Sequence, residues 1–435
     1  MKKPLIIISF ILTLILAVSC ATSQSASTSA STPAPISNAN PQPELQVLSS
    51  KPVHFLTAGP GQDASTQAII SWHATTPTAT LLYADTSEFG KSNYITLIGE
   101  PTGSDWYDLD SIYRFKVTLS DLTPGTTYTY QVQTEDGQLS DVSEFKTAGT
   151  DGTFSFAWLS DIHINLAANM KNVSDLLSYA KANTDIDFCL FSGDMVNRGQ
   201  TYRYWDYWTE SGVLTEMEYA FVIGNHEYYT SKNKKISEPT YFLDFAAIPD
   251  NHVDGSSEAD YWFLYDNVLF ICLDSIAADI AEGNSIRDRQ LGLIKTAIDE
   301  TWGKFTYVIV VQHYAFLDGD ADGSGKYSYW YQVFDNVGID LALSSDTHAY
   351  SRSRTLFNDE ESVSGTVYVT SPMTEGKEFS EFTNNTDSLG ERSAYNTVID
   401  VSGGCYIEVT PTELTLHVLG RDGVEYDSVT IPAHR

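Results

Sequence analysis

Five apolar runs in the chain each stop at side chains that can bind a metal or transfer a proton. Residues 154–160, 188–192, 219–223, 307–312 and 339–345 have the composition of buried β-strands. The polar residues that follow them are, in order, Asp161 and His163, Asp194, Asn225 and His226, His313, and Asp346 and His348. Ligands of α/β sheets collect beyond the carboxyl ends of the strands. The pattern therefore predicts one shared site.

Helical periodicity separates several of these runs. Residues 167–182 place Met170, Val173, Leu176, Leu177 and Ala180 on one face, and residues 286–298 repeat the pattern with Leu291, Ile294 and Ile298. Alternating strands and helices favour a layered α/β domain, which we assign to residues 152–435. Residues 406–431 return to strand alternation with a hairpin at 421–423, and we expect them to complete the same sheet system. Residues 202–208 are rich in Tyr and Trp, which either line a cleft or pack a helix into the core.

Residues 50–148 form a different, all-β segment. Short runs rich in Val, Ile, Thr and Tyr alternate with turn signals. The stretch 122–128, which ends at Tyr128, resembles the tyrosine-corner region of a fibronectin type III sandwich, with Trp72 as the core aromatic. Some other β-sandwich is the alternative, and neither assigns chemistry to the segment.

The first 49 residues indicate export. Residues 1–20 contain Lys2 and Lys3, an apolar run over 5–18 and then Ser19-Cys20, which is the layout of a secretory signal. The end of this run resembles a bacterial lipobox, although Ala17 stands where Leu is preferred. We expect a lipid anchor on Cys20 in the bacterial cell envelope, with a plain secretory signal as the alternative. Residues 21–49 are rich in Ser, Thr and Pro and predict a flexible tether.

Composition limits the possible partners. The chain has 25 Lys and Arg against 57 Asp and Glu, a net charge of −32, which excludes a general nucleic-acid binder. A small phosphorylated substrate remains compatible if metal ions neutralise the site locally. Cys189 and Cys272 lie within apolar strand patterns and are interpreted as small buried hydrophobes.

The donor set at the strand ends suits hard or borderline divalent metals. Carboxylate oxygen together with imidazole nitrogen favours Zn, Mn or Fe. Eight such groups exceed what one metal needs. Two metals that share a carboxylate account for seven of them and leave one histidine for acid–base chemistry. Two adjacent metals generate a hydroxide at neutral pH and balance charge in an in-line displacement at phosphorus.

The order Asp-x-His, Gly-Asp, Gly-Asn-His-Glu, His and x-x-His resembles the calcineurin-like metallophosphoesterases. A β-sandwich before that domain resembles the purple acid phosphatases in particular. The resemblance covers residues 50 to the C-terminus. It implies a four-layer αββα sandwich after the all-β segment, and hydrolysis of phosphate monoesters, with diesters or nucleotides as alternatives.

The resemblance also implies roles for individual residues. The first metal is expected on Asp161, His163 and His348, the bridge on Asp194, and the second metal on Asn225, His313 and Asp346. His226 would protonate the leaving oxygen. Arg198 stands in a segment that resembles the Gly-Asp-x-x-Asp-Arg-Gly of phosphoprotein phosphatases and could bind a phosphate. Its alternative is a surface arginine.

Three positions depart from the family pattern. His163 replaces a Gly and Asn197 replaces a Tyr of the purple acid phosphatases, so we expect no iron-tyrosinate colour. Asp346 replaces a histidine in the second metal's shell. A carboxylate there would shift the site from Zn toward Mn, Mg or Ca, or leave the second metal weakly held. The alternative function is therefore a surface-displayed binding or scaffold protein with a degenerate site.

Overall fold

The computed structural model describes residues 50–91, 93–101, 112–281, 285–317, 326–374, 392–397 and 402–434. The expected signal at 1–20, with Cys20, and the tether at 21–49 lie outside these residues. In the part of the chain that is described, no helix has the length and apolar character needed to cross a membrane.

The N-terminal strands form a β-sandwich. One layer orders its strands β4-β3-β7-β8 and the other β1-β2-β6-β5. Trp72 stacks on Phe115 in the core between them, with ring centroids 5.0 Å apart. The Tyr128 hydroxyl accepts a hydrogen bond from the Thr123 N–H at 2.9 Å. The strands are β1 (Val53–Pro60), β2 (Ala68–Ala74), β3 (Thr78–Asp85), β4 (Asn93–Ile98), β5 (Glu100–Pro101), β6 (Tyr113–Leu119), β7 (Thr127–Thr134) and β8 (Ser143–Lys146).

The larger of the two core sheets runs through both parts of the chain. Its order is β23-β22-β21-β9-β10-β11-β1-β2-β6-β5. The strands β9, β10 and β11 are parallel, and β1 of the sandwich pairs with β11 where Ala58 lies opposite Glu218. The C-terminal strands pair antiparallel beside β9, as the sequence predicts. The bounds are β9 (Phe154–Leu159), β10 (Phe188–Ser192), β11 (Glu218–Val222), β21 (Gly403–Val409), β22 (Glu413–Gly420) and β23 (Glu425–Pro432).

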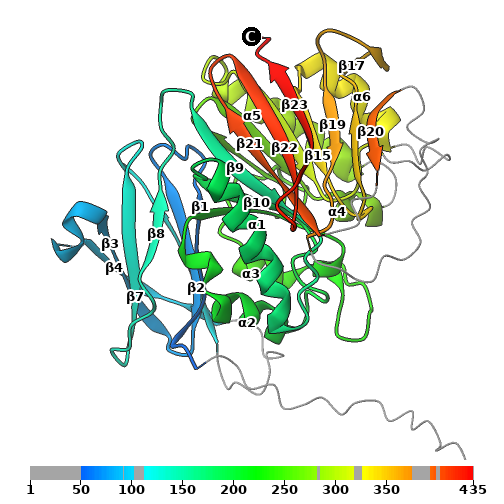
Figure 1. Cartoon of the computed structure of the whole chain (residues 1–435). Coiled ribbons are helices and arrows are strands. Elements are labelled where there is room, and N and C mark those ends of the chain that lie inside the picture. Colours follow the sequence, from blue (N-terminus) through cyan, green and yellow to red (C-terminus); the bar gives the residue numbers. More distant parts are fainter. Residues whose placement is uncertain are drawn as a thin grey trace, which may run out of the picture. The chain divides into compact units, whose positions relative to one another are not determined.

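A second sheet faces the first (Figure 1). Its order is β12-β13-β14-β15-β19-β16-β20, and β13, β14, β15 and β19 run parallel. The bounds are β12 (Tyr261–Tyr265), β13 (Val268–Leu273), β14 (Tyr307–Gln312), β15 (Leu341–Ser344), β16 (Tyr350–Ser353), β19 (Val367–Thr370) and β20 (Ser393–Thr397), with a small ribbon of β17 (Leu356–Phe357) and β18 (Glu360–Glu361).

Helices cover the outer faces of the two sheets and complete the four-layer αββα arrangement. The α helices are α1 (Met170–Asn183), α2 (Tyr202–Ser211), α3 (Thr240–Phe245), α4 (Ser275–Ile280), α5 (Ser285–Thr301) and α6 (Lys326–Val337). The short 3-10 helices are η1 (Thr86–Lys91), η2 (Ala167–Asn169), η3 (Val213–Thr215) and η4 (His226–Tyr228). Apolar side chains of α1 and α2 pack in the core of the first sheet, and those of α5 and α6 pack with β13, β14 and β15.

Aromatic rings from both sheets fill the space between them. Phe156 of β9 stacks on Phe188 of β10 at 5.0 Å, and Phe270 of β13 meets Phe156 edge-on at 5.3 Å. Offset-stacked and edge-to-face pairs of this kind add to the stabilisation from burial alone. This contact holds the two sheets, and so the ends of their strands, at one separation.

Two helices differ in detail from the pattern in the sequence. The buried face of α5 runs through Leu293, Ile294 and Ala297, while Leu291 and Ile298 are only partly buried. Gln290 also faces inward, where its amide donates to Oδ1 of Asp260 and to the Asp274 carbonyl, and this shifts the buried face of α5. The aromatic residues of α2 pack the helix into the core and do not line a cleft, because Tyr202, Trp205 and Trp208 are buried.

Glu218 is a buried carboxyl group at the pairing of β1 with β11. Its side chain is inaccessible, and neither carboxyl oxygen has a hydrogen-bond partner among the described residues. Burial, and secondarily the negative charge of Asp187, raises the pKa of Glu218 well above its ordinary value. The folded chain therefore keeps Glu218 neutral at pH values where the unfolded chain ionises it.

We predict that the unfolding free energy of Glu218→Gln increases relative to that of the wild type as pH rises. Above the unfolded pKa of ~4.3, a neutral buried carboxyl loses up to about 1.4 kcal/mol of unfolding free energy per pH unit. The amide of the glutamine does not ionise, so its contribution to the unfolding free energy does not change with pH. Urea unfolding of both proteins at pH 4, 6 and 8 measures the difference. A difference that stays constant across this range would contradict the neutral assignment.

Candidate metal centre

The carboxyl ends of five parallel strands from the two sheets meet at one edge. The strands β9, β10 and β11 come from the first sheet, and β14 and β15 from the second. Two contacts cross between the sheets there. Nδ1 of His313 lies 2.8 Å from the Ser192 carbonyl oxygen, and the hydroxyls of Ser192 and Ser345 are 2.6 Å apart. The sequence prediction that these strand ends converge is confirmed.

Asp194 lies at the centre of the group. Nε2 of His313 is 3.3 Å from its Oδ1 atom. On the other side, Nε2 of His163 and Nε2 of His226 are 3.7 and 3.8 Å from its Oδ2 atom. The two carboxylate oxygens thus face different imidazoles, which is the arrangement that a carboxylate shared by two metals requires.

One set of metal-capable atoms consists of Asp161, His163 and His348. Nε2 of His348 lies 3.1 Å from Nε2 of His163 and 3.4 Å from Oδ1 of Asp161. That Oδ1 atom is buried and has no hydrogen-bond donor among the described residues. Two imidazole nitrogens and a carboxylate oxygen directed at one point match the ligand chemistry of Zn, Mn or Fe. These residues fit the metal that the sequence predicts.

The other set lies around His313. Its Nε2 atom is 3.0 Å from Oδ1 of Asn225, and it joins Asp161 and Asp194 in a second group of metal-capable atoms. Asp346 lies at the outside of this group. Its Oδ1 atom is 3.6 Å from Nε2 of His313, and 39% of its side chain is exposed, whereas the His313 side chain is inaccessible. Asp346 as a second-metal ligand stays a prediction.

Strained backbone positions these side chains. Asp161, His163, Asp194, Asp346 and His348 all have positive φ, between 49° and 70°. Non-glycine residues in this region cost about 1–3 kcal/mol each and cluster at functional sites. Each of these residues follows the end of a strand by two or four positions, where a left-handed residue turns the chain sharply at the sheet edge.

Two glycines allow the strand ends to approach. A Cβ atom on Gly193, which has φ of 100°, would lie 2.5 Å from Nδ1 of His313. A Cβ atom on Gly224 would lie 2.3 Å from the backbone nitrogen of Asp194. Neither position accepts a side chain without moving a predicted ligand.

Opposite charges stabilise each other in the cluster. Burial acts to raise the pKa of Asp194, but His313 and His226 hold it well below its ordinary value. Burial acts to lower the pKa of His313, but the Asp194 carboxylate raises it well above the ordinary value. The pKa of His348 is raised by Asp161 against the effect of burial.

Glu227, the last residue of the Gly-Asn-His-Glu motif, is a positioning residue that the sequence analysis did not assign. Its buried carboxyl group accepts hydrogen bonds from the N–H groups of Asp194 at 2.9 Å, Gly224 at 2.8 Å and Val196 at 3.3 Å. Burial and the nearby Asp194 charge raise the pKa of Glu227 to about 8. This one side chain ties the loop of the central carboxylate to the loop of Asn225.

The start of α4 forms a second support with no signal in the sequence. Asp274 caps α4 through Oδ1, and its Oδ2 atom accepts from the Tyr228 hydroxyl at 2.6 Å. The neighbouring Ser275 hydroxyl accepts from the Tyr314 N–H at 3.0 Å. Tyr228 follows His226 by two residues and Tyr314 follows His313, so α4 fixes both histidine loops.

His226 and Arg198 have different surroundings. Nδ1 of His226 lies 2.7 Å from the Asn197 carbonyl, which directs Nε2 toward Asp194, and the His226 N–H donates to Oδ1 of Asp194 at 2.8 Å. Nε of Arg198 donates to Oδ1 of Asn233 at 2.6 Å. The acid role of His226 and the phosphate role of Arg198 stay predictions.

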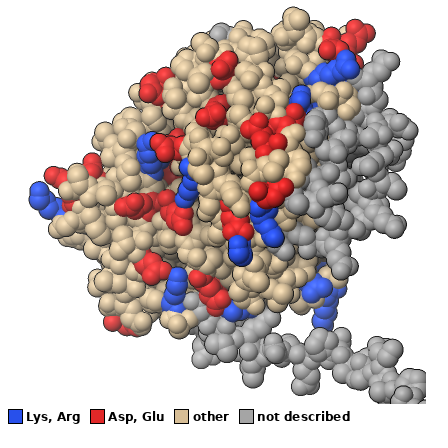
Figure 2. Space-filling view, viewed as in Figure 1, with Lys and Arg blue, Asp and Glu red and all other residues tan. Residues whose placement is uncertain are grey.

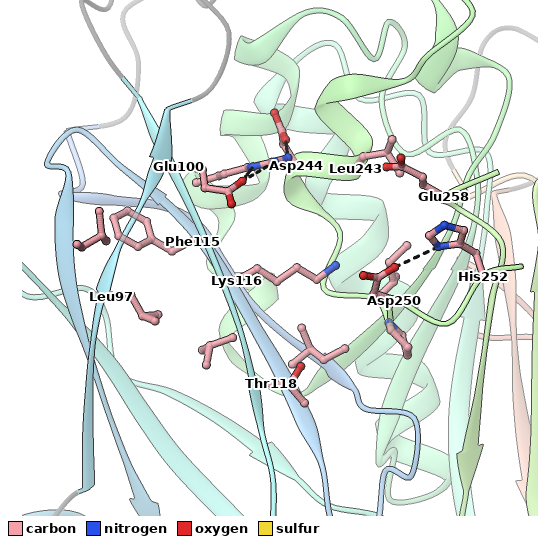
Figure 3. A pocket seen from close by; sticks show the side chains of 16 residues that line it. Leu97, Glu100, Phe115, Lys116, Thr118, Leu243, Asp244, Asp250, His252 and Glu258 are labelled. Atoms are coloured by element: carbon pink, nitrogen blue, oxygen red, sulfur yellow. Dashed lines mark hydrogen bonds and ion pairs between the residues drawn. The ribbon is translucent and has the colours of Figure 1, made fainter. Parts of the chain in front are cut away.

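A separate cavity of about 530 Å³ lies between β6 and the chain after α3 (Figure 3). Lys116 extends into it toward Asp250, which pairs with His252 at 3.1 Å. Its lining includes none of the predicted metal ligands. This cavity is therefore distinct from the site that the strand ends form.

Comparisons with known proteins agree with this geometry. Residues 154–350 match the calcineurin-like phosphoesterase family, and residues 54–147 match the purple acid phosphatase N-terminal domain. The structure of purple acid phosphatase PPD1 from yellow lupin (Lupinus luteus) seeds has a TM-score of 0.65 at 14% identity, over 88% of this chain and 74% of that one. The structure of PhoD has a TM-score of 0.60 at 14% identity, over 88% and 94%. At this identity both show a shared fold. No curated protein sequence matches the chain.

We predict that Glu227→Ala lowers metal affinity by about 10- to 100-fold, as loss of an outer-shell partner usually does. The substitution leaves three buried N–H groups without an acceptor and frees the loops that carry Asp194 and Asn225. Metal titration followed by calorimetry measures the change. Glu238→Ala, at an exposed glutamate in the same segment, is the control. Unchanged metal affinity in Glu227→Ala, with only a lower melting temperature, would reduce Glu227 to a purely structural role.

Proposed function

We propose that this chain, which contains a calcineurin-like phosphoesterase domain preceded by a purple acid phosphatase N-terminal domain, hydrolyses phosphate monoesters. As a phosphoric ester hydrolase, it would carry out this reaction at a centre for two divalent metals. The observation that supports two metals most directly is Asp194, whose carboxylate oxygens face His313 on one side and His163 and His226 on the other.

The contacts of the residues support an assignment of each ligand to one of the two metals. Asp161, His163 and His348 would hold one metal, Asn225 and His313 the other, and Asp194 both. When bound, the metals supply an activated water nucleophile and neutralise charge on the phosphoryl oxygens.

His226 supplies the proton for the leaving group in this proposal. The Asn197 carbonyl accepts from Nδ1 of His226, so Nε2 is the nitrogen that faces the cluster. An alkoxide leaves faster when it is protonated as the bond breaks. The carbonyl keeps the ring in one orientation for this transfer. With Asn197 in the tyrosine position, we propose a centre without the iron-tyrosinate colour.

Asp346 favours a second candidate function. Its side chain is partly exposed and stands 3.6 Å from His313, at the edge of the cluster. A second metal held weakly here would leave a surface-displayed binding or scaffold protein with little hydrolysis. The two functions differ in metal content and turnover.

We propose export to the bacterial cell envelope with a lipid anchor on Cys20, on the basis of residues 1–20. The expected result is that the wild type fractionates with membranes and that Cys20→Ala does not. Cell fractionation followed by mass spectrometry of the N-terminal peptide measures this. An unmodified Cys20 in the mature protein would refute the anchor.

For the enzyme, we predict two metals per chain and hydrolysis of p-nitrophenyl phosphate faster than of its bis ester. Metal analysis and initial rates with Zn, Mn, Fe and Mg measure both. Asp194→Asn is expected to lose at least about 100-fold in kcat/KM because the shared ligand is weakened. Asp346→His is expected to raise occupancy of the second metal. Fewer than two metals with no turnover in any ion favours the scaffold instead.

A further inference from the structure

Three lysines are concentrated in one exposed loop of a strongly acidic protein. Residues 231–235, here called the basic loop, contain Lys232, Lys234 and Lys235. The whole chain has only 25 Lys and Arg against 57 Asp and Glu. Figure 2 shows acidic side chains spread over the face in view. The basic loop therefore carries a local positive charge in a protein whose net charge is strongly negative.

The lysines of the basic loop have no carboxylate partner within ion-pair distance among the described residues. Many other cations of this chain are held by acidic side chains. Examples of such cations are Lys51, Lys146, Lys171, Lys181, Arg203, Lys295, Arg352, Arg354 and Arg392. In a chain with more than twice as many acids as bases, adjacent lysines without acidic partners leave positive charge available to a ligand.

Backbone contacts fix the basic loop to the turn that carries His226. The Thr230 N–H donates to the Lys234 carbonyl at 3.0 Å, and Lys235 pairs with Tyr229 in an antiparallel bridge. The ring of Tyr229 lies edge-on to the ring of His226, 5.3 Å between centroids. The basic loop therefore begins five residues after His226, the proposed proton donor, and is connected to its turn by these contacts.

Arg198 adds a fourth cation at the same place. Its Nε atom donates to Oδ1 of Asn233, in the middle of the basic loop, at 2.6 Å. The next residue, Gly199, donates its N–H to the His226 carbonyl at 2.8 Å. Arg198 therefore bridges the segment after Asp194 and the basic loop, and its partner there is a neutral amide.

We propose that the basic loop and Arg198 bind a second anionic group, a phosphate or carboxylate, on the leaving group of the substrate. This inference rests on the proposed phosphoesterase function. The metals neutralise the reacting phosphate, so that group does not account for four further cations. The loop that carries the lysines is joined through Tyr229 and Thr230 to the turn of His226, which serves the leaving oxygen in the proposed function. The substrate class is a phosphoester whose leaving group is itself charged.

Two matched substrates test the proposal. In 4-carboxyphenyl phosphate the leaving group is anionic, and in its methyl ester it is neutral. The ratio of their kcat/KM values is expected to fall roughly tenfold in Lys232→Gln/Lys234→Gln/Lys235→Gln. In the wild type the same ratio is expected to fall as salt rises from 0.05 to 0.5 M (chosen test conditions), because screening weakens exposed charge pairs.

The control variant is Lys91→Gln/Lys295→Gln/Lys304→Gln. It changes the net charge by the same three units at exposed lysines of other elements. An unchanged ratio in the control with a lowered ratio in the loop variant supports the proposal. Equal ratios in the loop variant and the wild type, or an equal fall in the control, overturn it. If the wild type hydrolyses neither compound, the proposed function fails, and the ratio of Kd values from calorimetry decides the loop proposal by the same criteria.

Discussion

The contact on which the site depends is the one between His313 and the Ser192 carbonyl, because it joins the ends of two different sheets. One partner follows β14 and the other ends β10, and Nδ1 lies 2.8 Å from the carbonyl oxygen. The same contact directs Nε2 of His313 toward Asp194. Packing of Phe156, Phe188 and Phe270 between the sheets sets the separation at which it forms. The separation of the two sheets therefore determines both the packing of the core and the positions of the predicted metal ligands.

The supports of the cluster are unequal in kind. Glu227 acts through three backbone N–H groups, whereas α4 acts through a cap and two side-chain contacts. Glu227 holds the loop of Gly193 and Asp194, and both of these residues have positive φ. Strain of that type persists only where surrounding contacts over-determine the backbone. The contacts of Glu227 therefore help to keep Asp194 in this conformation.

Strand and helix periodicity in the sequence predicted the layers and the convergence of the ligands, because buried strands and their polar endings leave a local signal. The strands β10 and β14 have the predicted bounds. The roles of Glu227, Asp274 and Ser275 could not be predicted, since each depends on a partner distant in sequence or on backbone atoms. The buried face of α5 was also misjudged. Its inward Gln290 resembles a surface residue until Asp274 and Asp260 are placed beside it.

The pairing of β1 with β11 has a consequence for how this chain could be divided. The sandwich covers an edge of the phosphoesterase sheet, so the connection near residue 150 is not a boundary between independent folding units. Removing the N-terminal strands would expose the backbone of β11 where Glu218 now lies opposite Ala58, and exposed sheet edges can pair with strands of other molecules. We therefore expect a chain shortened to the phosphoesterase segment to be more prone to self-association than the whole protein.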